Sequence, residues 1–245
     1  MRIAILLLVV ASCLPACAAT PGAASEENSE INDPFESFNR SMFAVNRFGD
    51  KVLYKPFGTA YKAVLPNFAR KGVGNFFDNL KTPRSSLNNF LQGKPGRGLS
   101  ELARFFFNTT IGVGGLFDVA ASGGMDRFDE DFSQTLAVWG VPDGPYLVIP
   151  IWGPRTVLST VALPVDIYTD LQLHFSNTGT RDKLYVLRVL DARALQLANA
   201  EELLEQYDPY LALRDVYLEN REYLIYDGDP PTDYCADYGV GCDEE

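Results

Sequence analysis

The residues that could carry out catalysis are few in this chain. His174 is the only histidine, and it lies in the mainly apolar stretch 171–175. The sequence has neither the Gly-x-Ser-x-Gly turn of serine hydrolases nor the Gly-x-x-x-x-Gly-Lys-Ser/Thr loop that binds nucleotide phosphates. The acidic run 126–131 lacks the spacing of a calcium loop. We therefore expect His174 to be structural and the protein to be no enzyme, with no metal and no cofactor.

Two cysteines near the N-terminus have the setting of a lipid-modified residue. Arg2 precedes a nine-residue apolar run from Ile3 to Ala11, which is too short to span a bilayer because a spanning helix needs about 20 residues. Small residues and a cysteine follow, as in a bacterial lipoprotein signal. Acylation of Cys17 gives a signal peptide of ordinary length, residues 1–16. Cys13 has the better small-residue context but leaves a short signal. Cleavage to an unanchored periplasmic protein is the alternative.

The residues after these cysteines favour anchoring at the outer membrane, facing the periplasm. Ala18 follows Cys17, whereas an aspartate there commonly holds bacterial lipoproteins at the inner membrane. Several acyl chains contribute about 0.8 kcal/mol per buried methylene and keep a protein on its membrane. Residues 17–31 are polar and rich in Ala, Ser and Glu, and we expect a flexible lipidated tether.

The other two cysteines, Cys235 and Cys242, lie in the acidic C-terminal tail, residues 229–245. In an oxidising periplasm their spacing favours a small disulfide loop over free thiols. A metal site is not expected, because the single histidine is far away in the sequence.

Charge and aromatic residues divide the chain. Residues 32–104 hold 12 Lys/Arg and 5 Asp/Glu, a net of +7, whereas residues 105–245 have a net of −16. Fifteen of the 16 Phe lie between residues 35 and 132, and ten of the 12 Tyr follow residue 145. A Phe-rich, cationic half suits acyl chains and anionic phosphates, although an ordinary core would show the same composition. No separate basic domain is present, so we expect no nucleic-acid binding.

Hydrophobic spacing predicts a mainly α single domain over residues 32–228. Asp33 and Glu36 predict a capped helix start with Pro34 at the first position, and Gly49 predicts the end of this helix. A second helix is expected from Pro66, interrupted at Pro83 and ending at Gly93.

The rest of the chain alternates between helical and irregular segments. Helix resumes near residue 97 and leads into the uncharged segment 105–117, which is long enough to lie in a membrane interface but not to cross a bilayer. Residues 132–154 are rich in Gly and Pro and predict irregular structure with short strands. Two helices are expected over 181–207 and from Pro209 to before Gly228.

An ordered set of segments resembles the MlaA/VacJ family. The first is Asn-Asp-Pro-Phe-Glu-Ser-Phe-Asn-Arg-Ser-Met-Phe at 32–43, and the longest is Arg-Phe-Phe-Phe-Asn-Thr-Thr-Ile-Gly-Val-Gly-Gly-Leu-Phe-Asp-Val-Ala at 104–120. The others are residues 89–93, 132–136, 139–141, 144–146, 193–195, 208–210 and 214–218. The set covers nearly all of residues 32–228, in order.

This resemblance implies a ring of amphipathic and interfacial helices, joined by Gly/Pro-rich loops, around an amphipathic channel. The implied function is removal of mislocalised phospholipids from the outer leaflet of the outer membrane, which maintains its lipid asymmetry. The implied partners are phospholipids, a porin trimer in the outer membrane and a soluble periplasmic lipid carrier. The alternative is a structural lipoprotein that scaffolds a porin or envelope complex without moving lipid.

Polar and glycine positions in the matched segments are the candidates for the channel or its gate. A lipid path needs polar groups and approachable backbone beside an apolar wall. The candidates are Asn39, Arg40, Asn46, Arg47, Asn108, Gly112, Gly114, Gly115 and Asp118. An equally weighted alternative is that these glycines only allow tight turns and close packing, with Asn108 and Asp118 as caps.

Overall fold

The first helical segment passes through three helices without a break. The computed structural model describes residues 33–230, without the side chains of residues 196–204. Helix α2 (Glu36–Gly49) continues as the π-helix η1 (Asp50–Tyr54) and then as α3 (Lys55–Val64). The predicted end at Gly49 is wrong, because Gly49 has an ordinary helical φ of −58°. A glycine permits a helix end but does not enforce one.

The predicted capping of α2 by Asp33 is also wrong. The N-cap residue is Phe35, which makes no side-chain capping bond. The Asp33 carboxylate instead accepts hydrogen bonds from the Asn39 side chain, at 2.9 Å, and from the Tyr210 hydroxyl. The carboxylate that was predicted to cap the helix is therefore bound instead by the Asn39 side chain and by the distant Tyr210.

Helix α4 (Asn67–Leu91) starts after Pro66, as predicted, but does not break at Pro83. A proline inside a helix costs about 3 kcal/mol. Buried side chains lie on both sides of Pro83, from Phe77 to Asn89, and α4 packs along α5 (Pro95–Thr110). We attribute the continuity of α4 to this packing. Gly93, with a φ of +76°, ends the segment as predicted.

The middle of the chain holds short elements and helices that the sequence did not reveal, including one at the start of residues 132–154, where irregular structure with short strands was predicted. Helix α6 (Val119–Ser122) and helix α7 (Phe132–Val138) precede strands β1 (Tyr146–Ile149) and β2 (Gly153–Thr156). The strands are antiparallel, with Tyr146 opposite Thr156. Helix α8 (Val157–Thr169) was not predicted, because its β-branched residues and Pro164 are untypical of helices. A capping box between Thr156 and Ser159 starts it.

The C-terminal helices follow their predicted positions. The short 3-10 helix η2 (Leu171–His174) leads to α9 (Thr178–Leu204) and α10 (Pro209–Ile225). His174 Nδ1 lies 3.1 Å from the Asp170 carbonyl oxygen, which is the structural role expected of it. The signal peptide, Cys13, Cys17, the tether and the pair Cys235 and Cys242 lie outside the described residues.

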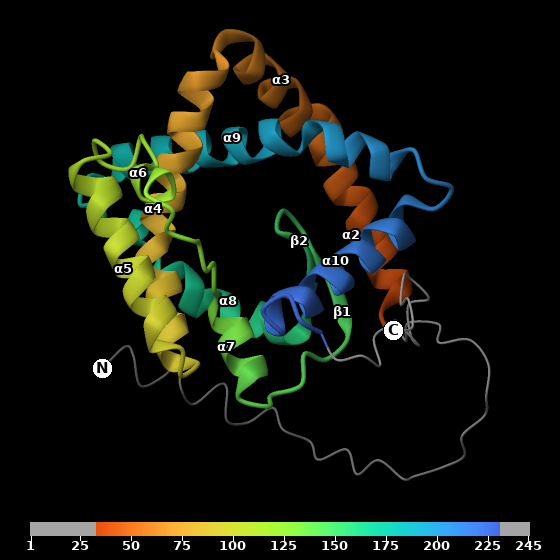
Figure 1. Cartoon of the computed structure of the whole chain (residues 1–245). Helices are drawn as coiled ribbons and strands as arrows, with labels where there is room; N and C mark the ends of the chain where they lie inside the picture. Colours follow the sequence, from red (N-terminus) through yellow and green to blue (C-terminus); the bar gives the residue numbers. More distant parts are fainter. Residues whose placement is uncertain (1–32, 231–245) are drawn as a thin grey trace, which may run out of the picture. The chain divides into compact units, whose positions relative to one another are not determined.

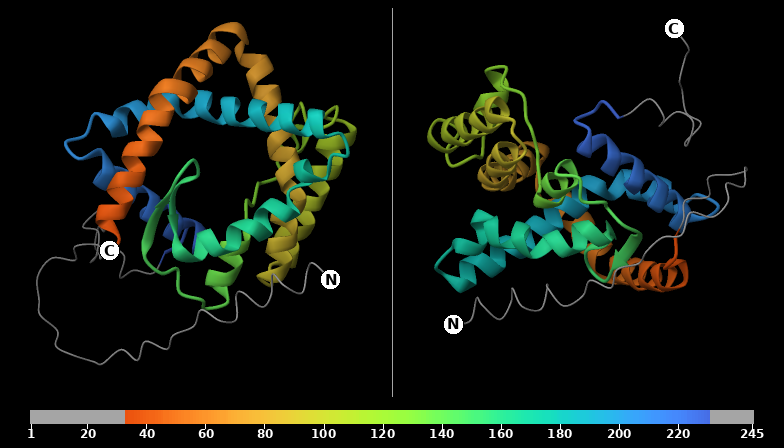
Figure 2. Two further views of the ribbon diagram at one scale, coloured as in Figure 1. Left: turned by 180° about the vertical axis from the view of Figure 1, so that it is seen from behind. Right: turned by 90° about the horizontal axis from the view of Figure 1, so that it is seen from below.

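Between Glu36 and Ile225 the helices form a ring (Figures 1 and 2). Helix α3 packs on α9, α4 on α5, α7 and α9, and α10 on α7, α9 and β2. The hairpin β1–β2 packs on α2 and projects toward the middle of the ring. The predicted mainly α ring is thus confirmed.

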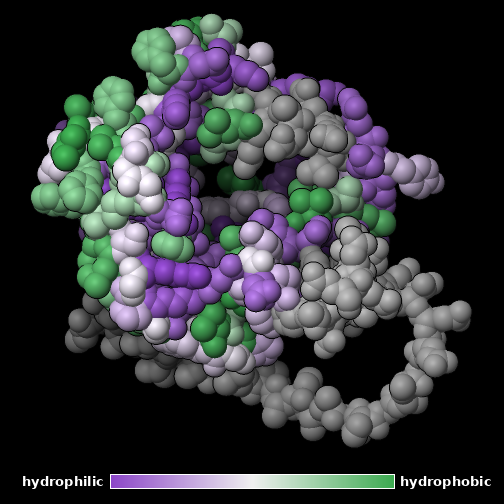
Figure 3. Space-filling model, viewed as in Figure 1, coloured by the Kyte–Doolittle hydropathy of each residue, from purple (hydrophilic) through white to green (hydrophobic). Residues whose placement is uncertain are grey.

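The distribution of polar and apolar side chains is inverted relative to a water-soluble domain. Among the described residues, 22 polar or charged side chains are buried but only 10 hydrophobic ones. Helix α5 shows how this arises, because it buries Glu101, Arg104 and Asn108 and exposes Leu99 and Phe106. Hydrophobic residues cover the outer edge near α5 in Figure 3. No helix in the described part of the chain is long and apolar enough to cross a membrane.

Candidate functional site

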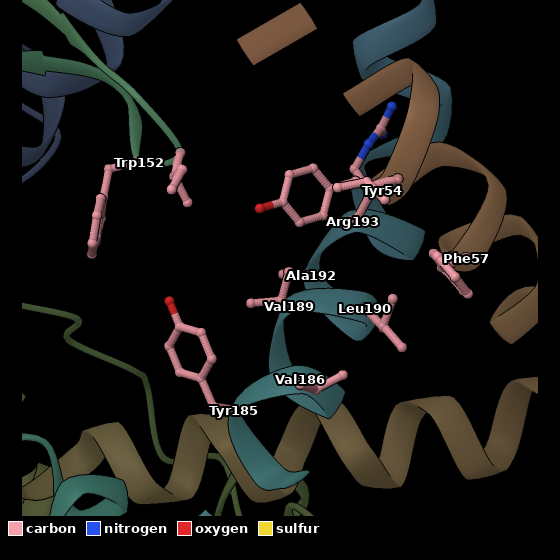
Figure 4. A pocket seen from close by; sticks show the side chains of 11 residues that line it. Tyr54, Phe57, Trp152, Tyr185, Val186, Val189, Leu190, Ala192 and Arg193 are labelled. Carbon is pink, nitrogen blue, oxygen red and sulfur yellow. The ribbon is translucent and has the colours of Figure 1, made fainter. Parts of the chain in front are cut away.

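A cavity of about 640 Å³ lies on the inner side of the ring. Leu53, Tyr54 and Phe57 line it from η1 and α3, Ile151 and Trp152 from the turn of the hairpin, and residues between Tyr185 and Arg193 from α9. Figure 3 shows the ring to be hollow at its centre. In Figure 4 the rings of Tyr54, Trp152 and Tyr185 approach the same space from three different elements. The cavity is large enough for a ligand of substantial size.

The lining of this cavity is amphipathic. Val186, Val189 and Leu190 give α9 an apolar surface there, while Tyr54 and Tyr185 add hydroxyl groups (Figure 4). A tyrosine presents an apolar ring and a polar end, which suits a boundary between hydrocarbon and water. The lining therefore suits a molecule that has both apolar and polar parts.

An ion pair joins η1 to α9, two of the elements that line the cavity. The Arg193 Nη2 donates to Asp50 Oδ2 at 2.8 Å, and Arg193 Nε donates to Asp50 Oδ1. The Arg193 side chain is only 11 % exposed, so the bidentate pair is strong. Asp50 is the first residue of the π-helix, and the pair ties this unusual turn to α9.

The hairpin turn has two apolar side chains and one residue in a strained backbone conformation. Ile151 has a φ of +73°, a left-handed conformation that costs a non-glycine residue about 1–3 kcal/mol. Ile151 and Trp152 are both exposed. The turn thus presents two large apolar side chains to the cavity.

Two of the predicted asparagines attach this hairpin to α2. Asn39 is fully buried; its Nδ2 donates to the Tyr146 carbonyl oxygen at 3.0 Å, and its Oδ1 accepts from the Val148 N–H at 2.8 Å. Asn46 does the same further along the hairpin, with the Ile149 carbonyl oxygen at 2.9 Å and the Ile151 N–H at 2.7 Å. The two asparagine side chains of α2 thus make hydrogen bonds that the backbone of a third strand would otherwise make at this edge of the hairpin.

The two predicted arginines differ in their surroundings. Arg40 donates to Glu36 at 2.7 Å and to both carboxylate oxygens of Asp208, which joins α2 to the start of α10. Its hydrogen bond to Asp208, with that to Glu36, raises the pKa of Arg40. Arg47 is exposed.

The second predicted group surrounds the loop between α5 and α6, on the opposite side of the ring from α2 (Figure 1). Asn108 donates to Asp118 at 3.0 Å and accepts from the Ala120 N–H at 2.9 Å. Arg104 donates to both Asp118 oxygens, at 3.2 and 2.9 Å, and to the Met125 carbonyl oxygen. Burial opposes ionisation of Asp118, but hydrogen bonds from the Ala121 N–H, Asn108 and Arg104 lower its pKa.

Two of the three predicted glycines are required by close packing. A Cβ on Gly112 would lie 2.2 Å from the Phe117 carbonyl oxygen, and one on Gly115 would lie 2.6 Å from Asn79 Cβ. Gly114 has a φ of +69° but open space around it. The packing role considered for these glycines holds for Gly112 and Gly115, whereas Gly114 has room for a side chain.

The sequence profile of the MlaA lipoprotein family matches residues 31–224. The chain belongs to this family. It is 33 % identical over 203 residues to the Escherichia coli protein named intermembrane phospholipid transport system lipoprotein MlaA, covering 81 % of this chain and 80 % of that one. The protein of the same name from Haemophilus influenzae is 32 % identical over 212 residues, covering 83 % of each chain.

A solved structure has a similar fold and a related sequence. It is described as a structural basis for maintenance of bacterial outer membrane lipid asymmetry. It matches with a TM-score of 0.69 and 32 % identity, and the match covers 79 % of this chain and 99 % of that one. The fold of this chain is therefore similar to that of a solved structure.

In this MlaA-family chain, the nine predicted site residues fall into two groups rather than one. Asn39, Arg40 and Asn46 hold the hairpin and α10 on α2. Asn108 and Asp118 organise the glycine loop, residues 111–118 between α5 and α6, across the ring. None of the nine is among the residues that line the central cavity. Their contact with a lipid path stays a prediction.

The cavity residues were not predicted from the sequence; they include Tyr54, Trp152, Tyr185 and Arg193. They are widely separated in the sequence and come together only when the ring closes. The only signal was the segment 193–195, which matches the family pattern and contains Arg193.

The glycine loop offers a first prediction about folding. Replacing Gly115 with alanine should lower the free energy of unfolding by about 2–3 kcal/mol, because the new Cβ adds a close contact with Asn79 to a backbone strain of about 1–3 kcal/mol. Gly114→Ala should lower it by only about 1 kcal/mol, since open space surrounds Gly114. Urea unfolding of both variants, followed by circular dichroism, compares them; equal losses would contradict the packing role of Gly115.

Proposed function

We propose that this protein removes mislocalised phospholipids from the outer leaflet of the outer membrane through the centre of its ring. The lipid would then pass to a soluble periplasmic carrier, so that the membrane keeps its asymmetry. The relatives named as intermembrane phospholipid transport lipoproteins support the phospholipid as cargo. The solved structure described in terms of outer membrane lipid asymmetry supports the outer membrane as the location and lipid asymmetry as the purpose.

The observation that carries the proposal is the amphipathic cavity inside a ring with an apolar exterior. A phospholipid crosses a bilayer slowly because its charged head group must enter hydrocarbon, at a cost of several kcal/mol or more. Each 1.4 kcal/mol removed from that barrier speeds passage about tenfold. Hydroxyl groups of Tyr54 and Tyr185 beside an apolar wall provide a path that lowers the barrier, and no catalytic residue is needed.

The exterior supports a position within one leaflet. The large hydrophobic side chains exposed on this chain are more numerous than is usual on a water-soluble monomer. Helices also satisfy their backbone hydrogen-bonding groups internally, as a protein at membrane depth must. Phe68 and Val64 near the α3–α4 corner are each 80 % exposed, and Lys62 and Lys71 lie beside them in the sequence. Such a corner suits the region where acyl chains meet anionic phosphates.

The anchor and the protein partners complete the proposal. Acylation of Cys17, or of Cys13, would tie the chain to the outer membrane. A porin trimer would lie against part of the apolar exterior, and the periplasmic carrier would accept lipid from the ring. The family name and the names of the relatives support a membrane-associated lipoprotein.

Deletion of the protein from its native cell tests the cellular role. A membrane-impermeant amine label should count more phospholipid at the cell surface after deletion, and the wild-type chain should restore the normal count. A variant that lacks both Cys13 and Cys17 should fail to do so. Unchanged surface phospholipid would favour the scaffold role instead.

Filling the cavity tests the path itself. Ala192 lines the cavity, so Ala192→Trp should slow lipid passage in vesicles at least tenfold while leaving the thermal unfolding temperature nearly unchanged. Leu195→Trp is the matched control, because Leu195 is 65 % exposed on the same helix and does not line the cavity. If both variants pass lipid at the wild-type rate, the central path is wrong. The rate of lipid passage by a Gly114→Leu variant tests in the same way whether the glycine loop gates the central path.

A further inference from the structure

A second cavity of about 250 Å³ adjoins the first. Tyr185 of α9 lines both cavities. The second cavity lies between α9 and the stretch from the end of α8 through η2. Its volume is below the roughly 300–1,000 Å³ of sites for drug-sized ligands, so it suits part of a lipid rather than a whole one.

The charges of this cavity are balanced. Arg181 and Arg188 line it together with Asp170 and Asp182, while Ile167 and Leu173 add apolar surface. The central cavity, by contrast, has Arg193 as its only charged lining residue among the residues that the structure describes. A site with two cations and two carboxylates matches a ligand that carries both signs of charge.

The two arginines are held with different firmness. Arg188 Nη1 donates to Asp170 Oδ2 at 2.7 Å and to Gln172 Oε1 at 3.0 Å. Asp170 and Gln172 are both buried, so the guanidinium has a fixed position. Arg181 Nε lies 3.5 Å from Asp182 Oδ1, and these side chains are 34 % and 69 % exposed. An exposed pair of this kind contributes little stability, so a ligand can separate it at small cost.

We propose that this second cavity binds the phosphoethanolamine head group of a zwitterionic phospholipid. This assignment rests on the function proposed above. The guanidinium of Arg181 donates to the phosphate, as arginine side chains do in many phosphate sites, and the carboxylate of Asp182 accepts from the ammonium group. The acyl chains then extend past Tyr185 into the central cavity.

The arrangement discriminates between head groups. An anionic lipid without an amine, such as phosphatidylglycerol, can use Arg181 but leaves the carboxylate of Asp182 close to its phosphate without a cation. Like charges placed together cost binding free energy, which is how a site rejects an unwanted ligand. We therefore expect the wild-type chain to retain phosphatidylethanolamine in preference to phosphatidylglycerol.

The test quantifies lipids that remain bound to the full chain after purification in mild detergent, by mass spectrometry. The wild-type chain should be enriched in phosphatidylethanolamine relative to the membrane extract. Asp182→Asn should lose this enrichment, with phosphatidylethanolamine reduced up to about tenfold, the effect of one charge-assisted hydrogen bond, and phosphatidylglycerol unchanged or increased. Arg181→Gln should reduce both lipids. Lys183→Gln is the control, because Lys183 is exposed on the same turn of α9 and does not line the cavity.

The outcomes separate this proposal from the function on which it rests. Bound lipid in the bulk membrane ratio, in the wild type and in both variants, would overturn the head-group site. The lipid path would survive that result if the wild-type chain still passes lipid in vesicles and Ala192→Trp slows it. A chain that neither retains nor passes lipid would overturn both. Loss of enrichment in Lys183→Gln as well would show a general charge effect and would also overturn the site.

Discussion

Replacing Arg104 with methionine is expected to lower the free energy of unfolding by about 3–5 kcal/mol, the usual effect of removing one partner from a buried ion pair. Arg104 is 4 % exposed and is the cation nearest to two carboxylates, Asp118 at 2.9 Å and Glu101 at 3.9 Å. Burial already raises the pKa of Glu101. Without Arg104, both carboxylates lose their compensating charge inside the ring.

Urea unfolding in detergent, followed by circular dichroism, measures this effect. Arg127→Met is the matched control: Arg127 pairs with Asp78 and Asp129 near the surface, and exposed pairs contribute about 1 kcal/mol or less. The effect of Arg104→Met should depend on pH. Because the pKa of Asp118 is lowered in the fold, its stabilisation is present above about pH 4 and is lost as the pH falls through its lowered pKa. Equal losses at pH 3 and pH 7 would instead assign the effect to packing.

Replacing Asn39 with leucine should detach the hairpin from α2 and cost about 2–6 kcal/mol. The substitution leaves the Tyr146 carbonyl oxygen and the Val148 N–H buried without their hydrogen bonds, at roughly 1–3 kcal/mol for each group. It also removes the donor to Asp33. Because Trp152 sits in the hairpin turn beside the cavity (Figure 4), we expect the hairpin to become mobile as well as the fold to become weaker.

Tryptophan fluorescence gives the readout for this second change. In a Trp139→Phe background, Trp152 is the remaining tryptophan, so its emission and quenching by acrylamide report on the hairpin turn alone. Asn46→Leu is the control and should have a smaller effect, because the Ile151 N–H that it leaves is exposed to water. An unchanged quenching rate in Asn39→Leu would show that the hairpin is held by its other contacts.

The helices that the sequence predicted well are those whose patterns are local. Pro66 and Gly93 mark the ends of α4, and Pro209 begins α10. The errors have two causes. At Gly49 and in the missed helix α8 the local signal itself was misleading, because a glycine lies inside a continuous helix and β-branched residues with Pro164 form one. At Asp33 and Pro83 a local signal was overridden by a contact with a distant segment, Tyr210 and α5 respectively. Such contacts cannot be inferred from one sequence alone.

The candidate site shows the same limit in another form. The asparagines were recognised as unusual polar residues on apolar helices, and they do have special partners. Those partners are backbone groups of the hairpin for Asn39 and Asn46, and the Ala120 N–H in α6 for Asn108, because buried amides must find hydrogen bonds. The cavity itself is lined mainly by aromatic and aliphatic residues, which form no recognisable motif in the sequence.

The inverted distribution of side chains has a thermodynamic consequence. Unfolding of a water-soluble domain raises the heat capacity by about 12–15 cal/mol/K per residue, because buried apolar surface becomes hydrated. In this chain many large hydrophobic side chains are already outside the ring, while hydrogen-bonded polar groups occupy much of its interior. Polar exposure lowers the heat capacity, so the increment per residue should fall well below the usual range. A plot of stability against temperature should then be unusually flat, and cold should weaken this fold less than it weakens an ordinary domain.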